Sequence, residues 1–183
     1  MTLNKIGATQ IPSEEASEKQ LELARRQGDV LRSALDVMIG EVADEGQEIE
    51  YGPYLIGYAI EDAEGMYHRD DNGELVWQEP DKENIHVEIS VRDKADGRFV
   101  PYLDIEARLI DSEGNDVGLH RQPFLWHPWL YHYGRNWIIE KGGDYTLEVR
   151  IKAPDFPRHN KKNGKRYSED VEVSFSAVKI DPK

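Results

Sequence analysis

Residues 85–91 read Ile-His-Val-Glu-Ile-Ser-Val, with a β-branched apolar residue at every second position. In a β-strand successive side chains point to opposite faces, so this segment has one apolar face and one face that carries His86 and Glu88. The apolar face predicts packing against a core. The same period of two returns at 54–60, 103–109, 145–151 and 171–175, and shorter strands are predicted near 117–121 and 135–140.

Glycine-containing turn signals separate these segments. They are Asn72-Gly73, Asp96-Gly97, Glu113-Gly114-Asn115-Asp116, Gly142-Gly143 and Asn163-Gly164. About seven short strands with no helical segment between them are typical of two packed antiparallel sheets. The sequence therefore predicts an all-β fold, with one antiparallel β-sandwich domain over residues 46–183.

The first 45 residues follow a different pattern. Residues 1–12 are predicted to be a flexible lead-in, and residues 13–45 to contain an N-terminal amphipathic α-helix with Ser13 as its N-cap. Its apolar side chains recur at helical spacing, at Leu23, Val30, Leu31, Ala34, Leu35, Met38 and Val42. We expect this helix to pack on the outside of the sandwich or on a partner subunit.

Composition excludes several classes of protein. The 183 residues carry a formal net charge of −13, which repels a phosphate backbone and disfavours nucleic acid as a partner. There is no cysteine, so disulfides, thiolate zinc sites, iron–sulfur clusters and blue-copper sites are excluded. No run approaches the ~20 apolar residues of a membrane span, so no membrane insertion is expected. Met1–Pro12 lacks a secretory signal pattern, which leaves a cytoplasmic protein or the mature form of an exported one.

Histidine is the commonest metal ligand in proteins, and four of the six histidines are candidate ligands: His86, His127, His132 and His159. His86 and Glu88 lie ~6–7 Å apart along one face of a strand, close enough to reach a common cation. The alternative for this pair is an ordinary solvent-facing strand. His159 lies in a loop beyond the strand at 145–151, where a solvated side chain is the usual outcome.

Segment 124–137 is the densest in aromatic residues and also holds His127 and His132. Pro128 and Gly134 predict an ordered loop between strands. We expect most of its aromatic side chains to belong to the core, because Trp and Tyr bury large areas. Two alternatives are a dry wall around a metal site and an exposed platform that stacks on sugars.

These segments, in this order, resemble the periplasmic iron-transport protein family, from about Glu48 to Val178. The matching elements are His86-x-Glu88, Pro101-Tyr102-Leu103, His132-Tyr133-Gly134-Arg135-Asn136 and Arg158-His159. The resemblance implies an immunoglobulin-like sandwich, a homodimer, an extracytoplasmic location and a membrane iron permease as partner. It also implies that copper binds as well as iron. An N-terminal helix is not among the features that the resemblance covers.

The resemblance further implies a set of ligands. The equivalents of His86, Glu88, His132 and His159 bind the metal in that family, together with a methionine. That methionine falls near Leu125, which cannot ligate, so His127 is the predicted replacement; Met66 is a more remote candidate. A site without sulfur is harder, which favours Cu(II), iron or zinc over Cu(I).

The sequence therefore predicts a transition-metal binding protein, accessory to iron uptake or handling, with no catalytic residues of its own. The first alternative is a carbohydrate- or protein-binding module that uses the aromatic segment 124–137. The second alternative is a copper or iron oxidoreductase, which requires an open coordination position and turnover. Convergence of the histidines favours a metal site, whereas coplanar exposed rings favour a sugar platform.

Overall fold

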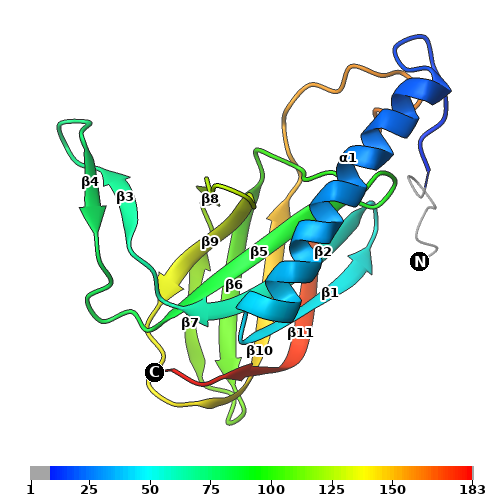
Figure 1. The fold of residues 1–183 in the computed structure, drawn as a ribbon. Coiled ribbons are helices and arrows are strands. Elements are labelled where there is room, and N and C mark those ends of the chain that lie inside the picture. Colours follow the sequence, from blue (N-terminus) through cyan, green and yellow to red (C-terminus); the bar gives the residue numbers. More distant parts are fainter. Residues whose placement is uncertain (1–8, 183) are drawn as a thin grey trace.

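Two antiparallel sheets pack face to face, and one helix lies across the outer face of the larger sheet (Figure 1). This arrangement comes from a computed structural model, which describes residues 9–182. The larger sheet has the order β1 (Glu45–Tyr51), β2 (Tyr54–Asp62), β5 (Ile85–Asp93), β9 (His132–Trp137) and β8 (Phe124–Leu125). The smaller sheet has the order β11 (Val171–Ile180), β10 (Gly143–Lys152), β6 (Asp104–Asp111) and β7 (Asp116–Arg121).

A separate hairpin of β3 (Met66–Arg69) and β4 (Leu75–Gln78) projects from the sandwich (Figure 1). The antiparallel β-sandwich is confirmed, but the described residues hold eleven strands rather than about seven. The four additional strands are β1, β3, β4 and β8. None of them shows the alternation of apolar and polar residues by which strands were predicted. β8 has only two residues, and the other three are mostly solvent-exposed, without a buried apolar face.

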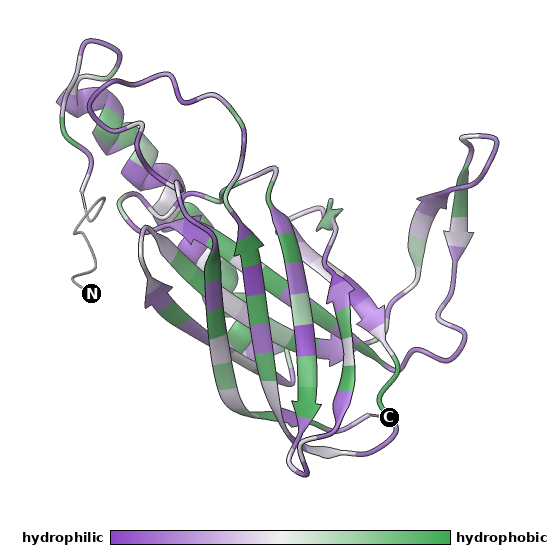
Figure 2. Cartoon of the chain, turned by 180° about the vertical axis from the view of Figure 1, so that it is seen from behind, coloured by the Kyte–Doolittle hydropathy of each residue, from purple (hydrophilic) through white to green (hydrophobic). Residues whose placement is uncertain are grey.

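The core lies between the two sheets and is built from the alternation that the sequence shows. Along β5 the side chains of Val87, Ile89 and Val91 are fully buried, and Ile105 and Leu109 face them from β6. Figure 2 shows the same alternation of hydrophobic and hydrophilic residues along the strands. Burying each such side chain contributes roughly 1.5–3 kcal/mol, which is why the strand pattern determines the fold.

The helix α1 spans Glu18–Val37 and continues as a π-helical turn over Met38–Val42. Its N-cap is Ser17 and not Ser13, because the Ser17 side chain accepts from the backbone of Gln20 while the Gln20 side chain accepts from Ser17. The predicted lead-in falls largely outside the described residues. Residues 9–12 belong to neither a helix nor a strand.

Helix α1 is fixed against the sandwich at two places. In its middle, Gly28 touches the turn after β5 so closely that a Cβ atom would lie 1.8 Å from the carbonyl oxygen of Asp96. Towards its end, Leu35 and Met38 pack with Ala59 of β2 and with Leu130. A glycine inside a helix normally costs roughly 0.5–1 kcal/mol, and here it permits the close approach.

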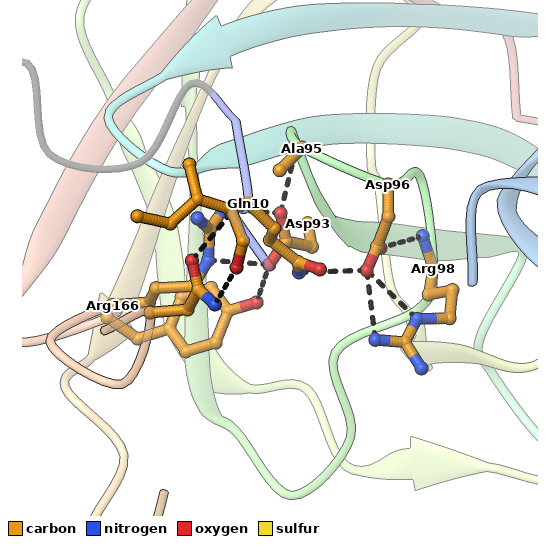
Figure 3. Close-up of polar contacts among 9 residues, drawn as sticks. Gln10, Asp93, Ala95, Asp96, Arg98 and Arg166 are labelled. Atoms are coloured by element: carbon orange, nitrogen blue, oxygen red, sulfur yellow. Dashed lines mark hydrogen bonds and ion pairs between the residues drawn. The ribbon is translucent and has the colours of Figure 1, made fainter. Parts of the chain in front are cut away.

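Buried polar side chains join the same turn to the C-terminal half of the chain (Figure 3). The carboxylate of Asp93 accepts from the guanidinium of Arg166 at 2.8 Å and from the hydroxyl of Tyr167. Asp96 accepts from Arg98 and from Gln10. The loop that follows β10 and the residues before α1 are thereby held at this end of the larger sheet.

Candidate metal centre

The outer face of β5 presents His86 and Glu88, and both are buried rather than solvent-facing. In the antiparallel register His86 lies opposite Asn136 of β9, and Glu88 lies opposite Gly134. His132 begins β9 and is also buried. One strand pairing therefore brings together residues that are 46 positions apart between His86 and His132.

The ligating atoms of His86, Glu88 and His132 all lie within 4.8 Å of one another. The shortest separation is 3.2 Å, between Nε2 of His132 and Oε1 of Glu88. The His86 and His132 rings stand nearly perpendicular, with centroids 5.7 Å apart. Two imidazole nitrogens and one carboxylate oxygen at these separations can reach one ion with bonds of about 2 Å.

The tautomer of His86 follows from its neighbour Asn136. The Asn136 side-chain amide donates to the backbone oxygen of Glu64 at 2.7 Å, so its oxygen faces His86. That oxygen lies 2.8 Å from Nδ1 of His86 and can only accept, which places the proton on Nδ1. Nε2 of His86 is then an unprotonated donor to a metal, and it is buried without a hydrogen-bond partner.

His132 is arranged in the same way by the backbone. Its Nδ1 lies 3.3 Å from the carbonyl oxygen of Leu130, which can only accept. The proton is therefore on Nδ1, and Nε2 carries the lone pair. This Nε2 is also buried, and it has no hydrogen-bond partner apart from the Glu88 carboxyl, whose Oε1 lies 3.2 Å away. Two buried imidazoles thus direct lone pairs into one place, an arrangement that a metal ion satisfies.

Gly134 leaves room for these rings. A Cβ atom at this position would lie 2.8 Å from Nε2 of His86 and 3.2 Å from Cδ2 of His132. Any other residue would therefore push the two rings out of place. The His132-Tyr133-Gly134-x-Asn136 element supplies one imidazole, space for the second, and the acceptor that orients it. Tyr133 adds a buried anchor, because its hydroxyl donates to the carbonyl of Val100 at 2.8 Å.

Burial shifts all three groups towards their neutral forms. Loss of solvation, reinforced by the nearby Glu61 and Glu64 carboxylates, raises the pKa of Glu88 to about 8. Burial lowers the pKa of His132 to about 3, and it also lowers the pKa of His86. The contact between His132 and Glu88 is therefore not an ion pair at neutral pH. A bound cation reverses this balance, because its charge favours the carboxylate and its orbitals accept the imidazole lone pairs.

The structure places the other two predicted ligands differently. His127 is half-buried, its ring centroid is 6.2 Å from that of His132, and its Nδ1 is buried without a hydrogen-bond partner. His159 is exposed in the loop after β10. Among residues 9–182, the group of three or more side chains able to hold a metal is His86, Glu88 and His132, without His127 or His159.

The aromatic segment 124–137 differs from the expectation in two respects. It is not one loop, because β8 and β9 both lie within it. Most of its aromatic side chains are exposed rather than part of the core: Phe124, Trp126, Trp129 and Tyr131 are exposed, whereas Tyr133 and Trp137 are buried. The exposed rings belong to residues outside or at the edge of the sheet, where the sandwich offers no second layer to cover them.

Gly134 was predicted to lie in a loop, whereas it lies within strand β9, and Asn136 had no predicted role beyond its place in a motif. The roles of both residues follow from the antiparallel pairing, since a residue directly opposite a ligand is placed to orient it or to give it space. Only the register of β5 against β9 identifies which residue stands opposite which.

Comparisons with known proteins identify a family and match the fold. The model of the Fe2+ transport protein family matches residues 46–179. FetP of uropathogenic Escherichia coli strain F11 is 19% identical, with a TM-score of 0.60 over 74% of this chain and 95% of that one. A copper-bound variant of Campylobacter jejuni P19 is 20% identical, with a TM-score of 0.64 over 75% of this chain and 96% of that one.

No curated protein matches the chain. Within the described residues, no helix is long and apolar enough to cross a membrane. The family match covers nearly all of the β-sandwich and ends short of helix α1, which precedes residue 46. By this match the chain belongs to the Fe2+ transport protein family.

Proposed function

We propose that this protein binds a transition-metal ion as cargo at His86, Glu88 and His132, and that it serves iron uptake or handling. One observation carries the proposal: two buried imidazoles direct their Nε2 lone pairs to one place beside a buried carboxyl group, and Nε2 of His86 has no hydrogen-bond partner. A structural network would satisfy this atom, because a buried polar atom without a partner costs roughly 1–3 kcal/mol. The family match and the copper-bound solved relatives support iron and copper as the ions concerned.

The donor set indicates which ions fit. Imidazole nitrogen and carboxylate oxygen suit Fe(II), Cu(II) and Zn(II), and among these Cu(II) should bind most tightly by the general order of divalent affinities. The role of each residue follows from its surroundings. His86 and His132 ligate through Nε2, and Glu88 ligates through the carboxylate oxygen once the ion has displaced its proton.

The test is metal analysis of protein purified without an affinity tag, followed by calorimetric titration with Cu(II), Fe(II) and Zn(II). We expect the wild-type protein to contain near-stoichiometric metal. We expect His132→Gln to lower metal affinity by more than about 100-fold, since even the loss of a supporting group costs 10–100-fold. His68→Gln is the matched control, because His68 is exposed on the β3 strand of the projecting hairpin. Equal affinity in His132→Gln and His68→Gln would refute the site.

His127 and His159 are proposed as additional ligands. The ring centroid of His127 lies 6.2 Å from that of His132, and its buried, unpartnered Nδ1 favours a role beyond packing. His159 is exposed on a loop that is tied to the N-terminal segment, where Asn160 donates to Ser13 at 2.8 Å. If His159 ligates as the resemblance implies, a second copy of the chain presents it.

The remaining proposals follow from the resemblance. They are a homodimer, an immunoglobulin-like strand topology, an extracytoplasmic location and an iron permease as partner. The relative FetP was expressed in the periplasm, which supports the location. Light scattering of the metal-loaded protein tests the dimer, and a monomer at micromolar concentration would exclude it together with a ligand from a second copy.

A further inference from the structure

Helix α1 and its π-helical turn cover the outer face of the larger sheet beside the metal centre. A cavity of about 30 Å³ remains between them. It is lined by Met38 and Leu35 on the helix side and by Ala59, Glu88 and His132 on the sheet side. A cavity of ~10–15 Å³ is sufficient for one water molecule, so this space is large enough for a single ion next to Glu88 and His132. His86 does not line the cavity, but its ligating nitrogen lies within 4.8 Å of the ligating atoms of those two residues.

Met38 is the first residue of the π-helical turn and is only 4% exposed. The other two side chains that this segment contributes to the cavity, Leu35 and Ile39, consist of hydrocarbon alone. Met38 is therefore the one residue of the helix lining that carries an atom able to bind a metal. Its three rotatable bonds let the thioether adapt to an ion without moving the backbone. Single π-helical turns within helices are frequent at functional sites.

Two contacts fix the backbone of helix α1 and of Met38 beside the cavity. The contact of Gly28 with the backbone of Asp96 leaves no space for the helix to move towards the sheet at its middle. The backbone N–H of Met38 donates to the carbonyl oxygens of Ala34 and Leu35, which ties the residue to the last turn of α1. Met38 thus faces the cavity from a fixed backbone position.

We infer that the thioether of Met38 is a ligand of the metal centre, and that the N-terminal helix thereby completes a site for Cu(I) with the imidazoles of His86 and His132. The inference rests on the proposed function and extends it to a second oxidation state of copper. Two neutral nitrogens and one thioether suit the soft, monovalent Cu(I), whereas the Glu88 carboxylate suits Cu(II) and Fe(II). The centre is then not the sulfur-free, hard site that Leu125 in the sequence implied.

The experiment compares the full-length wild type with Met38→Leu, which conserves side-chain volume. Cu(I) affinity is measured anaerobically by competition with a chromophoric chelator, Cu(II) affinity is measured by calorimetry, and copper X-ray absorption detects sulfur among the ligands. We expect sulfur in the wild-type Cu(I) spectrum. We expect Met38→Leu to lose that sulfur and to lower Cu(I) affinity by about ten-fold or more, with Cu(II) affinity nearly unchanged.

Met66→Leu is the matched control, because Met66 lies in strand β3 of the projecting hairpin. Selenomethionine-labelled protein with Met38 intact gives an independent measurement, in which selenium should appear as a copper ligand, so the test does not depend on folding of the variant. Metal binding without sulfur or selenium at Cu(I), or the loss of sulfur in Met66→Leu instead, would overturn the assignment of Met38 and leave the proposed function intact. A wild type that binds no copper or iron would overturn both.

Discussion

Two buried polar clusters stand at opposite ends of β5, and they differ in whether their atoms have partners. At the end of the strand, the Asp93 carboxylate is hydrogen-bonded to Arg166, Tyr167 and the backbone of Ala95. At its start, Nε2 of His86 has no partner, and Nε2 of His132 has none apart from the Glu88 carboxyl at 3.2 Å. Burial is similar in the two clusters, so burial alone does not identify a functional site. What distinguishes the start of the strand is convergence, because two imidazole nitrogens and a carboxyl oxygen lie there within 4.8 Å of one another, close enough to reach one ion.

The largest effect that separates the two clusters is expected at Asp93. Asp93→Asn removes the negative charge that faces the buried Arg166 guanidinium, and breaking such a pair costs roughly 3–5 kcal/mol. We expect the free energy of unfolding to fall by about that amount in urea titrations, while metal affinity stays as in the wild type. A large loss of metal affinity in a folded Asp93→Asn protein would mean that the two clusters are not independent.

Glu88→Gln should raise the free energy of unfolding of the metal-free protein, whereas Asp93→Asn lowers it. The folded state retains the Glu88 proton up to about pH 8, whereas the unfolded chain releases it near the ordinary value of 4.5. Between these values the folded state binds more protons, so this group makes the metal-free protein less stable as pH rises. Glu88→Gln removes that loss and should stabilise the metal-free protein by about 1–3 kcal/mol at pH 8, and by little at pH 5.

His86 and His132 make stability depend on pH in the opposite direction to Glu88, and this acidic dependence is the internal control for the Glu88→Gln variant. Their lowered pKa values mean that the unfolded chain binds their protons first, so stability is lost as pH falls from about 6.5 towards 3. Thermal melts of the metal-free wild type should therefore decline on both sides of a maximum. Glu88→Gln should keep the acidic decline only, while binding Cu(II) more weakly. A variant that is less stable than the wild type at pH 8 would contradict a raised pKa for Glu88.

A smaller effect is expected at Asn136, which orients a ligand without being one. Asn136→Ala removes the acceptor for Nδ1 of His86 and frees the ring to adopt the other tautomer. We expect metal affinity to fall by about ten-fold. Asn136→Asp restores an acceptor at the same place and should recover much of that loss. Equal losses in both variants would indicate a role in packing only.

The smallest effects are expected at His127, which packs against an aromatic ring but also has a buried ring nitrogen without a hydrogen-bond partner. If it ligates, His127→Ala should lower Cu(II) or Zn(II) affinity by roughly ten-fold or more and change metal-free stability little. If it only packs beside Trp129, whose ring centroid is 5.8 Å away, the variant should lose ~1 kcal/mol of stability and retain its affinity. The two results are separated by one titration and one melting experiment.

Much of this protein follows from local pattern. The alternation in β2, β5, β6, β10 and β11 predicted a two-sheet sandwich, because burying apolar area is the largest favourable contribution to folding. The same alternation put His86 and Glu88 on one face. Helix α1 was predicted from an apolar stripe, but Leu23, Val30 and Val42 of that stripe are exposed, whereas Leu21 and Ala24 outside it are buried. The first residue of the helix also differs, since Ser13 and Ser17 are both good N-caps and only the side chain of Gln20 distinguishes them.

Other features depend on how strands and helix come together. The exposure of His159 and Trp126, the opposition of Gly134 to Glu88, and the position of Met38 over the centre all depend on contacts between segments far apart in the chain. A single sequence contains no register and no packing distance. Met38 illustrates the difference: its spacing marks it as one more apolar residue of a helix, and only the cavity shows which polar groups it faces.

By itself, then, the sequence determined the sandwich, the outer helix and the residue types of a metal centre, because the periods of two and 3.6 and the chemistry of imidazole are local properties. The tertiary structure decided the rest. It brought three of the five candidate side chains together, oriented the two imidazoles through Asn136 and the Leu130 carbonyl, and placed a helix over the neighbouring cavity. Convergence depends on distances across strands, and these exist only once the chain has folded.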